Sequence, residues 1–293
     1  MIYKYTLINI ITYSFLRFFS FILSYIPRKS SLMIGSFFGL LMYYIFPLRS
    51  KVAKINLSIA FKEKTKSEIN LILKNTYKHF GKLMIEFIRM HTIRIKSDLI
   101  KYDSIYKKDL NSKKGLIFMT AHFGNWEVIS SILHKYKKVK AIARVQKNNG
   151  GNKFFNECRS LPNITLISNK GSKRKMLKTL IDNEILLIAS DQNAKKHGTN
   201  IDFFGKSCSI PKGAGHFYSA TDCKLLIGFC ILNKDLTYNL KIKNIILKNN
   251  REQKNNLIVE INTIYSKMLE NIITKYPEQY FWFHKKWDKG IYN

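Results

Sequence analysis

The pattern of apolar and polar positions divides the chain into an apolar N-terminal part and a longer mixed part. The run Tyr5–Ile26 carries one charge, Arg17, and its roughly 22 residues would extend about 33 Å as a helix. This length suffices to cross a bilayer. The run ends in Pro-Arg-Lys at residues 27–29 and not in the small residues of a signal-peptide cleavage site, so we expect an uncleaved membrane anchor.

A second apolar stretch, Leu32–Phe46, is shorter and predicts a helix that lies in the membrane interface or returns into it. It holds Gly35 and Gly39 in a G-x-x-x-G spacing, which fits either a helix-pairing face or chance. A buried core hairpin is the alternative for the whole region. We expect residues 1–50 to be a membrane anchor with an interfacial segment, and residues 51–293 to form one further domain.

Beyond residue 60, helical and strand signals alternate. Thr65 and Glu68 have capping-box spacing, and apolar residues then recur with helical period up to Ile88, which predicts one long amphipathic helix. A second periodic helix, residues 257–272, stops before Pro277. Short apolar runs predict strands at residues 115–120, 139–143, 164–167, 185–190 and 225–230. This alternation predicts an α/β fold with a mixed central sheet flanked by helices.

Basic residues far outnumber acidic ones. Fifty Lys and Arg against 19 Asp and Glu give a net charge of +31, which predicts an anionic partner, although an AT-rich genome can produce the same bias. Five basic residues follow the apolar run: Arg28, Lys29, Arg49, Lys51 and Lys54. By the positive-inside tendency, they place the bulk of the chain in the cytoplasm. The four cysteines form no C-x-x-C pair, and no His stands at zinc spacing, which indicates neither a disulfide framework nor a metal site.

The segment with the clearest chemistry is TAHFGNWE, residues 120–127, which follows a buried strand and precedes an apolar helical run. His122 would end the strand, and Asn125 could cap a helix whose first turn holds Glu127. If the turn folds back, Glu127 can accept a hydrogen bond from the Nδ1–H group of His122, which leaves Nε2 as a base with a pKa of about 6.5. Such a pair suits the deprotonation of an alcohol.

The spacing of this pair is not diagnostic by itself. Seven histidines in a chain with 19 acidic residues give about half a match by chance. A second match, His197 with Asp202, lies in a polar connection that contains glycine. The strand-to-helix context favours His122, with a structural histidine at a strand end as the alternative.

Residues 120–127 resemble the active-site block of the late acyltransferases of lipid A biosynthesis, the lauroyl and myristoyl transferases of Gram-negative bacteria. Further blocks follow in the family's order: Arg144 after a strand, Arg159 in ECRS, Asp191–Gln192 in ASDQN, FFG at 203–205 and PEQYFWFHKKW at 277–287. With the anchor, the resemblance covers nearly the whole chain. It implies a glycerolipid acyltransferase-like fold in which residues 51–293 form the acyltransferase domain.

The resemblance also implies a reaction: transfer of a fatty acyl chain from acyl carrier protein to a hydroxyl of a lipid A precursor of the Kdo-linked lipid IVA type. No cofactor and no covalent acyl-enzyme would be involved. His122 would take the hydroxyl proton, and Glu127 would stabilise the imidazolium. Arg159 would stabilise the oxyanion, with backbone N–H groups of the turn as competitors.

Six further residues are expected to contact substrate: Asn125, Arg144, Asp191, Gln192, His284 and Lys285. Arg144 would bind a lipid phosphate, since a guanidinium matches phosphate geometry. From residue chemistry alone, Arg144 and Arg159 could equally form structural ion pairs, and the Asp191–Gln192 pair could be structural. The last block departs from the family, because Lys285 and Lys286 stand where relatives have two arginines, which puts the phosphate geometry in doubt.

The resemblance places the protein in the bacterial inner membrane, with its catalytic domain facing the cytoplasm and membrane phospholipids among its partners. An alternative with the same mechanism acylates a glycerophospholipid or another glycolipid, although no FPEG-type phosphate block follows His122. An alternative of another class, a membrane-tethered nucleic-acid-binding protein, would explain the charge. The sequence has no RNP-like, helix-turn-helix or zinc pattern, so we expect no nucleic-acid partner.

Overall fold

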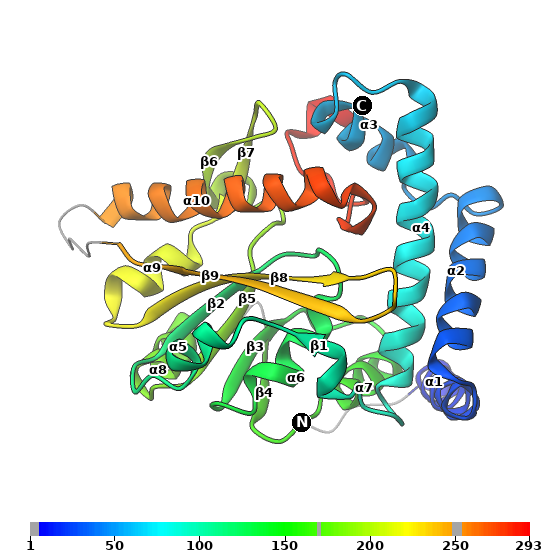
Figure 1. The fold of residues 1–293 in the computed structure, drawn as a ribbon, viewed down its shortest axis with the longest axis horizontal. Helices are drawn as coiled ribbons and strands as arrows, with labels where there is room; N and C mark the ends of the chain where they lie inside the picture. Colours follow the sequence, from blue (N-terminus) through cyan, green and yellow to red (C-terminus); the bar gives the residue numbers. More distant parts are fainter. Residues whose placement is uncertain (1–5, 169–170, 248–253) are drawn as a thin grey trace.

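The computed structural model describes residues 6–168, 171–247 and 254–293. Its strands are β1 Ile100–Lys101, β2 Leu116–Thr120, β3 Val139–Ala143, β4 Ile164–Ser168, β5 Ile185–Ala189, β6 Gly198–Phe203, β7 Lys206–Pro211, β8 Lys224–Leu232 and β9 Tyr238–Ile245. Seven of them form a central sheet in the order β1-β9-β8-β2-β5-β3-β4 (Figure 1). Neighbours run parallel except for β8 and β9, which pair antiparallel. The strands β6 and β7 form a separate hairpin.

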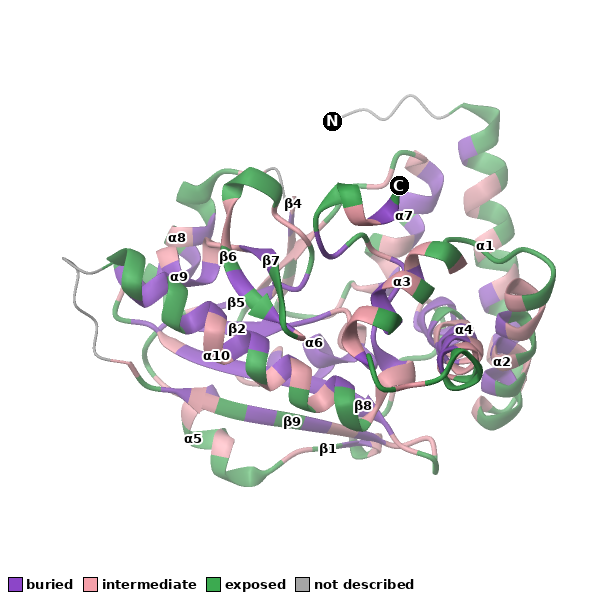
Figure 2. Ribbon diagram, turned by 90° about the horizontal axis from the view of Figure 1, so that it is seen from above, coloured by how far each residue is buried: buried purple, intermediate pink, exposed green. Residues whose placement is uncertain are grey.

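Helices cover both faces of this sheet, and further helices lie at one end of the molecule. The α-helices are α1 Leu7–Tyr25, α2 Arg28–Tyr44, α3 Ser50–Ala60, α4 Lys66–Arg89, α5 Lys107–Leu110, α6 Ser130–Leu133, α7 Asn149–Cys158, α8 Lys173–Ile181, α9 Gly213–Ala220 and α10 Lys254–Lys275. Short 3-10 helices are η1 Ser97–Leu99, η2 Ser104–Tyr106, η3 Trp126–Ile129, η4 Lys195–His197, η6 Pro277–Gln279 and η7 Lys289–Tyr292. Figures 1 and 2 show α1 and α2 beside α4 at one end of the molecule.

The central strand β2 packs on a different hydrophobic cluster at each face of the sheet. Ile117 and Met119 belong to the cluster that contains the apolar side chains of α8, α9 and α10. Leu116 and Phe118 belong to the cluster formed with α6, α7 and the end of α4. Alternate residues of a strand point to opposite faces, so a run that is apolar throughout produces a sheet covered by helices on both sides.

Most of the predicted elements are confirmed. The five predicted strands are β2, β3, β4, β5 and β8, the two long helices are α4 and α10, and the sheet is mixed. The capping box is present, since Oγ1 of Thr65 accepts a hydrogen bond from the backbone N–H of Glu68 and the Glu68 carboxylate accepts one from the backbone of Thr65. The sequence reading missed β9, whose burial nearly alternates, and the hairpin in which Phe204 and Gly205, at φ of 54° and 71°, make the turn.

The two glycines of the G-x-x-x-G spacing form a helix-pairing face. The helix α2 packs along α4, and its buried residues Ser31, Gly35 and Gly39 recur every four positions. A Cβ atom at Gly35 would lie 2.6 Å from the carbonyl oxygen of Gly81 in α4, and one at Gly39 would lie 2.2 Å from the carbonyl oxygen of Tyr77. These distances mean that the backbones of α2 and α4 touch directly, as small residues allow.

We expect Gly39→Leu to lower the melting temperature of the detergent-solubilised protein, because the new side chain must push two helix backbones apart. Overpacking typically costs about 1–3 kcal/mol, and backbone cannot yield as a side chain can. Circular dichroism during heating measures the effect. The control Met33→Leu changes a residue of α2 that is 64% exposed and should leave the melting temperature unchanged. An unchanged Gly39→Leu variant would contradict the close approach of α2 and α4.

Candidate active site

A histidine and an aspartate meet where two neighbouring strands end. Because β2 and β5 pair in parallel, their carboxyl ends lie at the same edge of the sheet. His122 follows β2, Asp191 follows β5, and Nδ1 of His122 lies 2.8 Å from Oδ1 of Asp191. The side chain of His122 is 24% exposed, whereas that of Asp191 is 3% exposed. The edge of the sheet therefore holds a partly accessible imidazole on a buried carboxylate.

The electrostatics of this pair favour an ionised aspartate. Burial by itself would lower the pKa of His122, but the charge of Asp191 and its hydrogen bond outweigh burial and raise that pKa. Burial would raise the pKa of Asp191, yet His122 and the nearby Lys286 bring it below its ordinary value. An ionised carboxylate at Nδ1 selects the tautomer with hydrogen on Nδ1. The lone pair of Nε2 is then available as a base.

Glu127 does not accept the expected hydrogen bond from His122, so that prediction is wrong. Its carboxylate instead pairs with Arg159, which directly follows α7: Nε lies 2.8 Å from Oε2, and Nη2 lies 2.6 Å from Oε1. The short helix η3 turns Glu127 toward α7, and Asp191 occupies the Nδ1 side of the imidazole. The Glu127 charge still acts on His122, where it raises the pKa to a smaller degree than Asp191 does.

The guanidinium of Arg159 is held in a fixed orientation near the imidazole. Two of its nitrogens donate to Glu127, and its central carbon lies 5.2 Å from the centre of the Phe87 ring. A guanidinium carries five N–H donors, so a bidentate pair with one carboxylate leaves others for a substrate atom. The ion pair therefore orients Arg159 without using up its donors.

The turn between His122 and Glu127 is fixed by backbone contacts. Gly124 has a φ of +57°, and a Cβ atom there would lie 1.8 Å from the carbonyl oxygen of Cys230. Its N–H donates to the Gln279 carbonyl, and the N–H of Asn125 donates to the Cys230 carbonyl. These two N–H groups thus have protein acceptors, which argues against them as oxyanion donors. The buried ring of His79 lies behind the turn, with Nε2 3.4 Å from the Gly124 carbonyl oxygen, and burial lowers its pKa to about 3.

Asn125 stands at the N-cap position of η3, as expected, but its side chain makes no capping hydrogen bond. Its side-chain nitrogen donates to the hydroxyl of Tyr238, at 2.8 Å, and that hydroxyl donates to the carboxylate of Glu86, at 2.9 Å. Glu86 also accepts hydrogen bonds from Arg28, at the start of α2. Asn125 is 3% exposed. Its amide therefore belongs to a buried polar network that ties the turn to α4 and α2.

The C-terminal segment 277–287 packs against the candidate base. The backbone N–H of Phe281 donates to the carbonyl oxygen of His122, at 3.0 Å. The rings of Trp126 and Phe281 lie 5.0 and 6.1 Å from the imidazole, measured between ring centres. Aromatic contacts on the ring and a carboxylate at Nδ1 together restrict the orientation of His122.

The three residues His284–Lys286 have different surroundings. Nε2 of His284 accepts a hydrogen bond from the backbone N–H of Asn193, and burial lowers the pKa of this histidine. Lys285 is exposed, with its ammonium 5.4 Å from the Tyr292 ring. Lys286 is 2% exposed, and its ammonium donates to the carbonyl oxygen of Asp191, at 2.6 Å. The sequence analysis noted Lys286 only as a departure from the family and did not count it among the site residues, although a lysine in a block rich in aromatic residues is a candidate for a buried, paired cation.

The remaining expected substrate contacts lie at exposed positions. Gln192 is exposed beside Asp191. Arg144 is exposed after β3 and helps to line a pocket of about 450 Å³, together with Lys147, Thr12 and Leu16 of α1, and Phe155 of α7. The backbone carbonyl of Arg144 accepts a hydrogen bond from the side chain of Gln146. Because β3 pairs in parallel with β5, Arg144 follows β3 at the same edge of the sheet as Asp191, although no hydrogen bond or ion pair in the described part of the chain joins it to the His122–Asp191 pair.

The second histidine and acid of matching spacing do not form a comparable site. His197 is exposed in η4, and the carboxylate of Asp202 accepts a hydrogen bond from the backbone N–H of Gly205 in the hairpin turn. The four cysteines are buried and unpaired. Within residues 6–168, 171–247 and 254–293, no three His, Cys, Asp or Glu side chains gather as metal ligands would. Of the two pairs, only His122 is held by a carboxylate at the sheet edge.

The comparison with protein families gives the class of the enzyme. Residues 3–289 match the family model described as bacterial lipid A biosynthesis acyltransferase. A search of curated proteins finds no match. The matched range contains His122, Asp191, Glu127, Arg159 and the segment 277–287 that packs on them. Because the match covers nearly the whole sequence, the chain belongs to the bacterial lipid A biosynthesis acyltransferase family.

Proposed function

We propose that the protein transfers a fatty acyl chain from acyl carrier protein to a hydroxyl of a lipid A precursor of the Kdo-linked lipid IVA type. The observation that carries this proposal is the hydrogen bond of 2.8 Å between His122 and Asp191, at a sheet edge where the Glu127–Arg159 ion pair also lies. A neutral imidazole on an ionised carboxylate is suited to take a proton from an alcohol. Membership of the family supplies the lipid A substrate class.

The proposed reaction is a direct transfer. Nε2 of His122 takes the hydroxyl proton while the acceptor oxygen attacks the thioester carbonyl carbon. The tetrahedral intermediate then collapses, the C–S bond breaks, and the carrier thiolate leaves with the proton from the imidazolium. Asp191 holds the ring and stabilises its positive charge during the transfer. No covalent acyl-enzyme forms, and no cofactor is needed.

Arg159 is the proposed donor to the oxyanion. The Glu127 carboxylate holds the guanidinium of Arg159 through two hydrogen bonds, so the remaining N–H groups have a defined direction. A donor that is already oriented costs little reorganisation when negative charge develops, which is why fixed donors stabilise such intermediates strongly. In this proposal Glu127 acts mainly by positioning Arg159, and only secondarily through its charge on His122.

Anionic groups of the substrates account for the positive charge. The pocket lined by Arg144 and Lys147 is the proposed site for a lipid phosphate, and His284 and Lys285 are proposed contacts nearer the base. The wider excess of +31 would favour an acidic carrier protein and the anionic phospholipids of the inner membrane, with the catalytic domain in the cytoplasm. A nucleic-acid-binding role is no longer needed to explain the charge.

Mass spectrometry of reactions with the purified, detergent-solubilised protein tests the proposal. Acyl carrier protein loaded with fatty acids of different lengths is the donor, and the tetra-acylated Kdo-linked disaccharide lipid is the acceptor. We expect the acceptor to gain the mass of one acyl chain. A parallel reaction with lysophosphatidate examines the alternative acceptor. Acylation of lysophosphatidate alone, or no acylation of the disaccharide lipid, would contradict the proposed substrate.

A further inference from the structure

The N-terminal helix α1 has two faces with opposite surroundings. Within the described residues, α1 is the one helix that is long and apolar enough to cross a membrane. Large apolar residues recur on its outer face, where each is at least 40% exposed: Leu7, Ile11, Phe15, Phe18, Ile22 and Tyr25. Its inner face carries Asn9, Ser20 and Leu23, which are at most 8% exposed. The outer residues follow one another in steps of three and four, and the inner residues are eleven and three positions apart, which are close to whole turns of one helix with two different faces.

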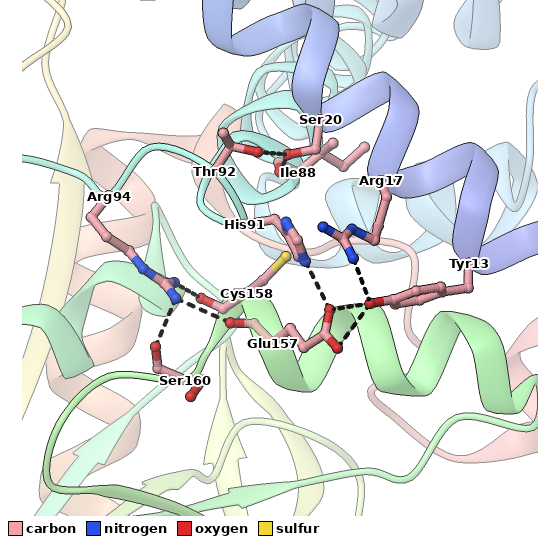
Figure 3. Close-up of polar contacts among 10 residues, drawn as sticks. All are labelled: Tyr13, Arg17, Ser20, Ile88, His91, Thr92, Arg94, Glu157, Cys158 and Ser160. Atoms are coloured by element: carbon pink, nitrogen blue, oxygen red, sulfur yellow. Dashed lines mark hydrogen bonds and ion pairs between the residues drawn. The ribbon is translucent and has the colours of Figure 1, made fainter. Parts of the chain in front are cut away.

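The inner face is attached to the catalytic domain at its start, in its middle and toward its end, and Figure 3 shows the contacts of Tyr13 and Ser20. In the first turn, the Asn9 side chain accepts a hydrogen bond from the backbone of Asn149, at the start of α7. In the middle, the Tyr13 hydroxyl donates to the Glu157 carboxylate, at 2.9 Å. Toward the end, the Ser20 hydroxyl donates to the carbonyl oxygen of Ile88 in α4, at 2.7 Å.

The end of α1 is also bound to the catalytic domain. The guanidinium of Arg89, in the last turn of α4, donates to the carbonyl oxygens of Leu23 and Ile26 and to the hydroxyl of Ser31. These contacts satisfy carbonyl groups that a helix end leaves without partners. From Asn9 to Ile26, therefore, α1 lies on α7 and α4 and does not project from the domain.

Charged groups lie level with the middle of α1. The carboxylate of Glu157 contacts both Tyr13 and the imidazole of His91. The ammonium of Lys153 lies 4.4 Å from the Tyr13 ring, and the guanidinium of Arg17 lies 5.7 Å from it. If α1 crossed a bilayer, these groups would be at the depth of the hydrocarbon core, where charges are strongly disfavoured. If α1 lies along the surface, the same groups are on its aqueous side.

From these observations we infer that α1 is an in-plane membrane helix that docks the catalytic domain on the lipid surface, and that it does not span the bilayer. This inference deepens the membrane location in the proposed function and changes none of its chemistry. The length of α1 and its apolar outer face are compatible with either orientation. The contacts with α7 and α4 decide between them, because a helix bound along its length to a charged domain cannot enter the hydrocarbon core alone.

In this inference, the outer face of α1 contacts a lipid bilayer with anionic headgroups. Residues 7–48 contribute 16 of the 24 large apolar residues that are exposed in the described chain. They include the outer residues of α2, Phe37 and Phe38, and Phe46 and Leu48 in the loop that follows it. Exposed cations stand in the first turn of α2, at Lys29, and in and just before the next helix α3, at Arg49, Lys51 and Lys54. An aromatic and apolar surface bordered by cations fits the interface of an anionic leaflet.

Single-cysteine labelling of the full chain in membranes tests the orientation. The four native cysteines are buried, so they give a low background with a membrane-impermeant maleimide. Thr6→Cys marks one end of α1, Ser30→Cys lies just beyond the other end, and Lys289→Cys marks the catalytic domain; all three positions are exposed. We expect all three to react from the same side of sealed vesicles. Reaction of Thr6→Cys only from the side opposite Lys289→Cys would overturn the inference.

Depth measurements give a second, independent test. Spin labels on Ile11→Cys, Phe15→Cys, Phe18→Cys and Ile22→Cys should lie at nearly equal depths near the acyl boundary, while Asn156→Cys on α7 should be in water. A spanning helix would instead give the greatest depth in the middle and shallow ends, and a face covered by a second copy would shield the labels from lipid. Either result would overturn the inference. The proposed acyl transfer is measured separately, in detergent, so the two proposals can fail independently.

Discussion

His122→Ala is expected to lower kcat/KM for acyl transfer by about 10²–10⁴-fold, the range that general-base catalysis contributes. The variant removes the only imidazole held on a carboxylate at the edge where β2 and β5 end, among the residues that the structure describes. The assay follows the transfer of a radiolabelled acyl chain from acyl carrier protein to the lipid acceptor. Pre-bound substrates and the Arg159 donor would leave a residual rate above the uncatalysed reaction.

The controls for this prediction separate catalysis from folding. His197→Ala removes an exposed histidine that has the same spacing to an acid, and we expect near-normal turnover. Because the His122 ring also packs against Trp126 and Phe281, His122→Gln provides a second variant that retains a polar side chain there. It should be as inactive as His122→Ala and should melt close to the unchanged protein. Near-normal turnover in both His122 variants would eliminate the proposed base.

Asp191→Asn is expected to lower kcat by about 10²–10⁴-fold, since an amide cannot enforce the tautomer with a free Nε2 or stabilise the imidazolium. It should also change the pH profile. The base acts when it is deprotonated, so activity rises as the pH increases through the pKa of His122. Asp191 raises that pKa against the effect of burial. Loss of its charge must therefore move the acid limb of the kcat/KM profile to lower pH.

Glu127→Gln is the informative comparison for Asp191→Asn. Glu127 affects the pKa of His122 less than Asp191 does, and its carboxylate holds Arg159. We expect Glu127→Gln to lose activity through Arg159 but to move the acid limb by less. Asp222→Asn, at a carboxylate that is 87% exposed, should change neither quantity. A larger pH shift in Glu127→Gln than in Asp191→Asn would restore Glu127 as the main partner of the base.

The sequence located the turn that holds the candidate base, but not the carboxylate that pairs with its histidine. His122 and Glu127 are neighbours along the chain, and their spacing suggested a local pair. The observed acceptor, Asp191, is 69 residues away and arrives only because β5 pairs in parallel with β2. Lys286 reaches Asp191 from the end of the chain in the same way. Side chains brought together by strand order have no fixed spacing in sequence, so periodicity cannot pair them.

In the N-terminal region, too, the sequence predicted the local helices but not their long-range contacts. Hydropathy predicted the helices α1 and α2 because an apolar run with helical length is a local property. Whether a run spans a membrane depends on what lies beside it, and Glu157, Arg89 and Gly81 stand far along the chain from their partners in α1 and α2. The expectation of a membrane anchor over residues 1–50 stays a prediction. The orientation of α1 relative to the membrane is inferred from its contacts with α7 and α4, which the sequence alone does not reveal.

Local order in the sequence therefore determined the five strands β2, β3, β4, β5 and β8, the long helices, the candidate base and the family to which the chain belongs. Each of these depends on patterns within short stretches of the chain: apolar runs, helical period, caps and blocks such as TAHFGNWE. The tertiary structure decided which carboxylate holds His122, which one holds Arg159, and which face of α1 is free. Those choices depend on sheet order and on helix contacts between distant segments, because hydrogen bonds and packing act across space and not along the chain.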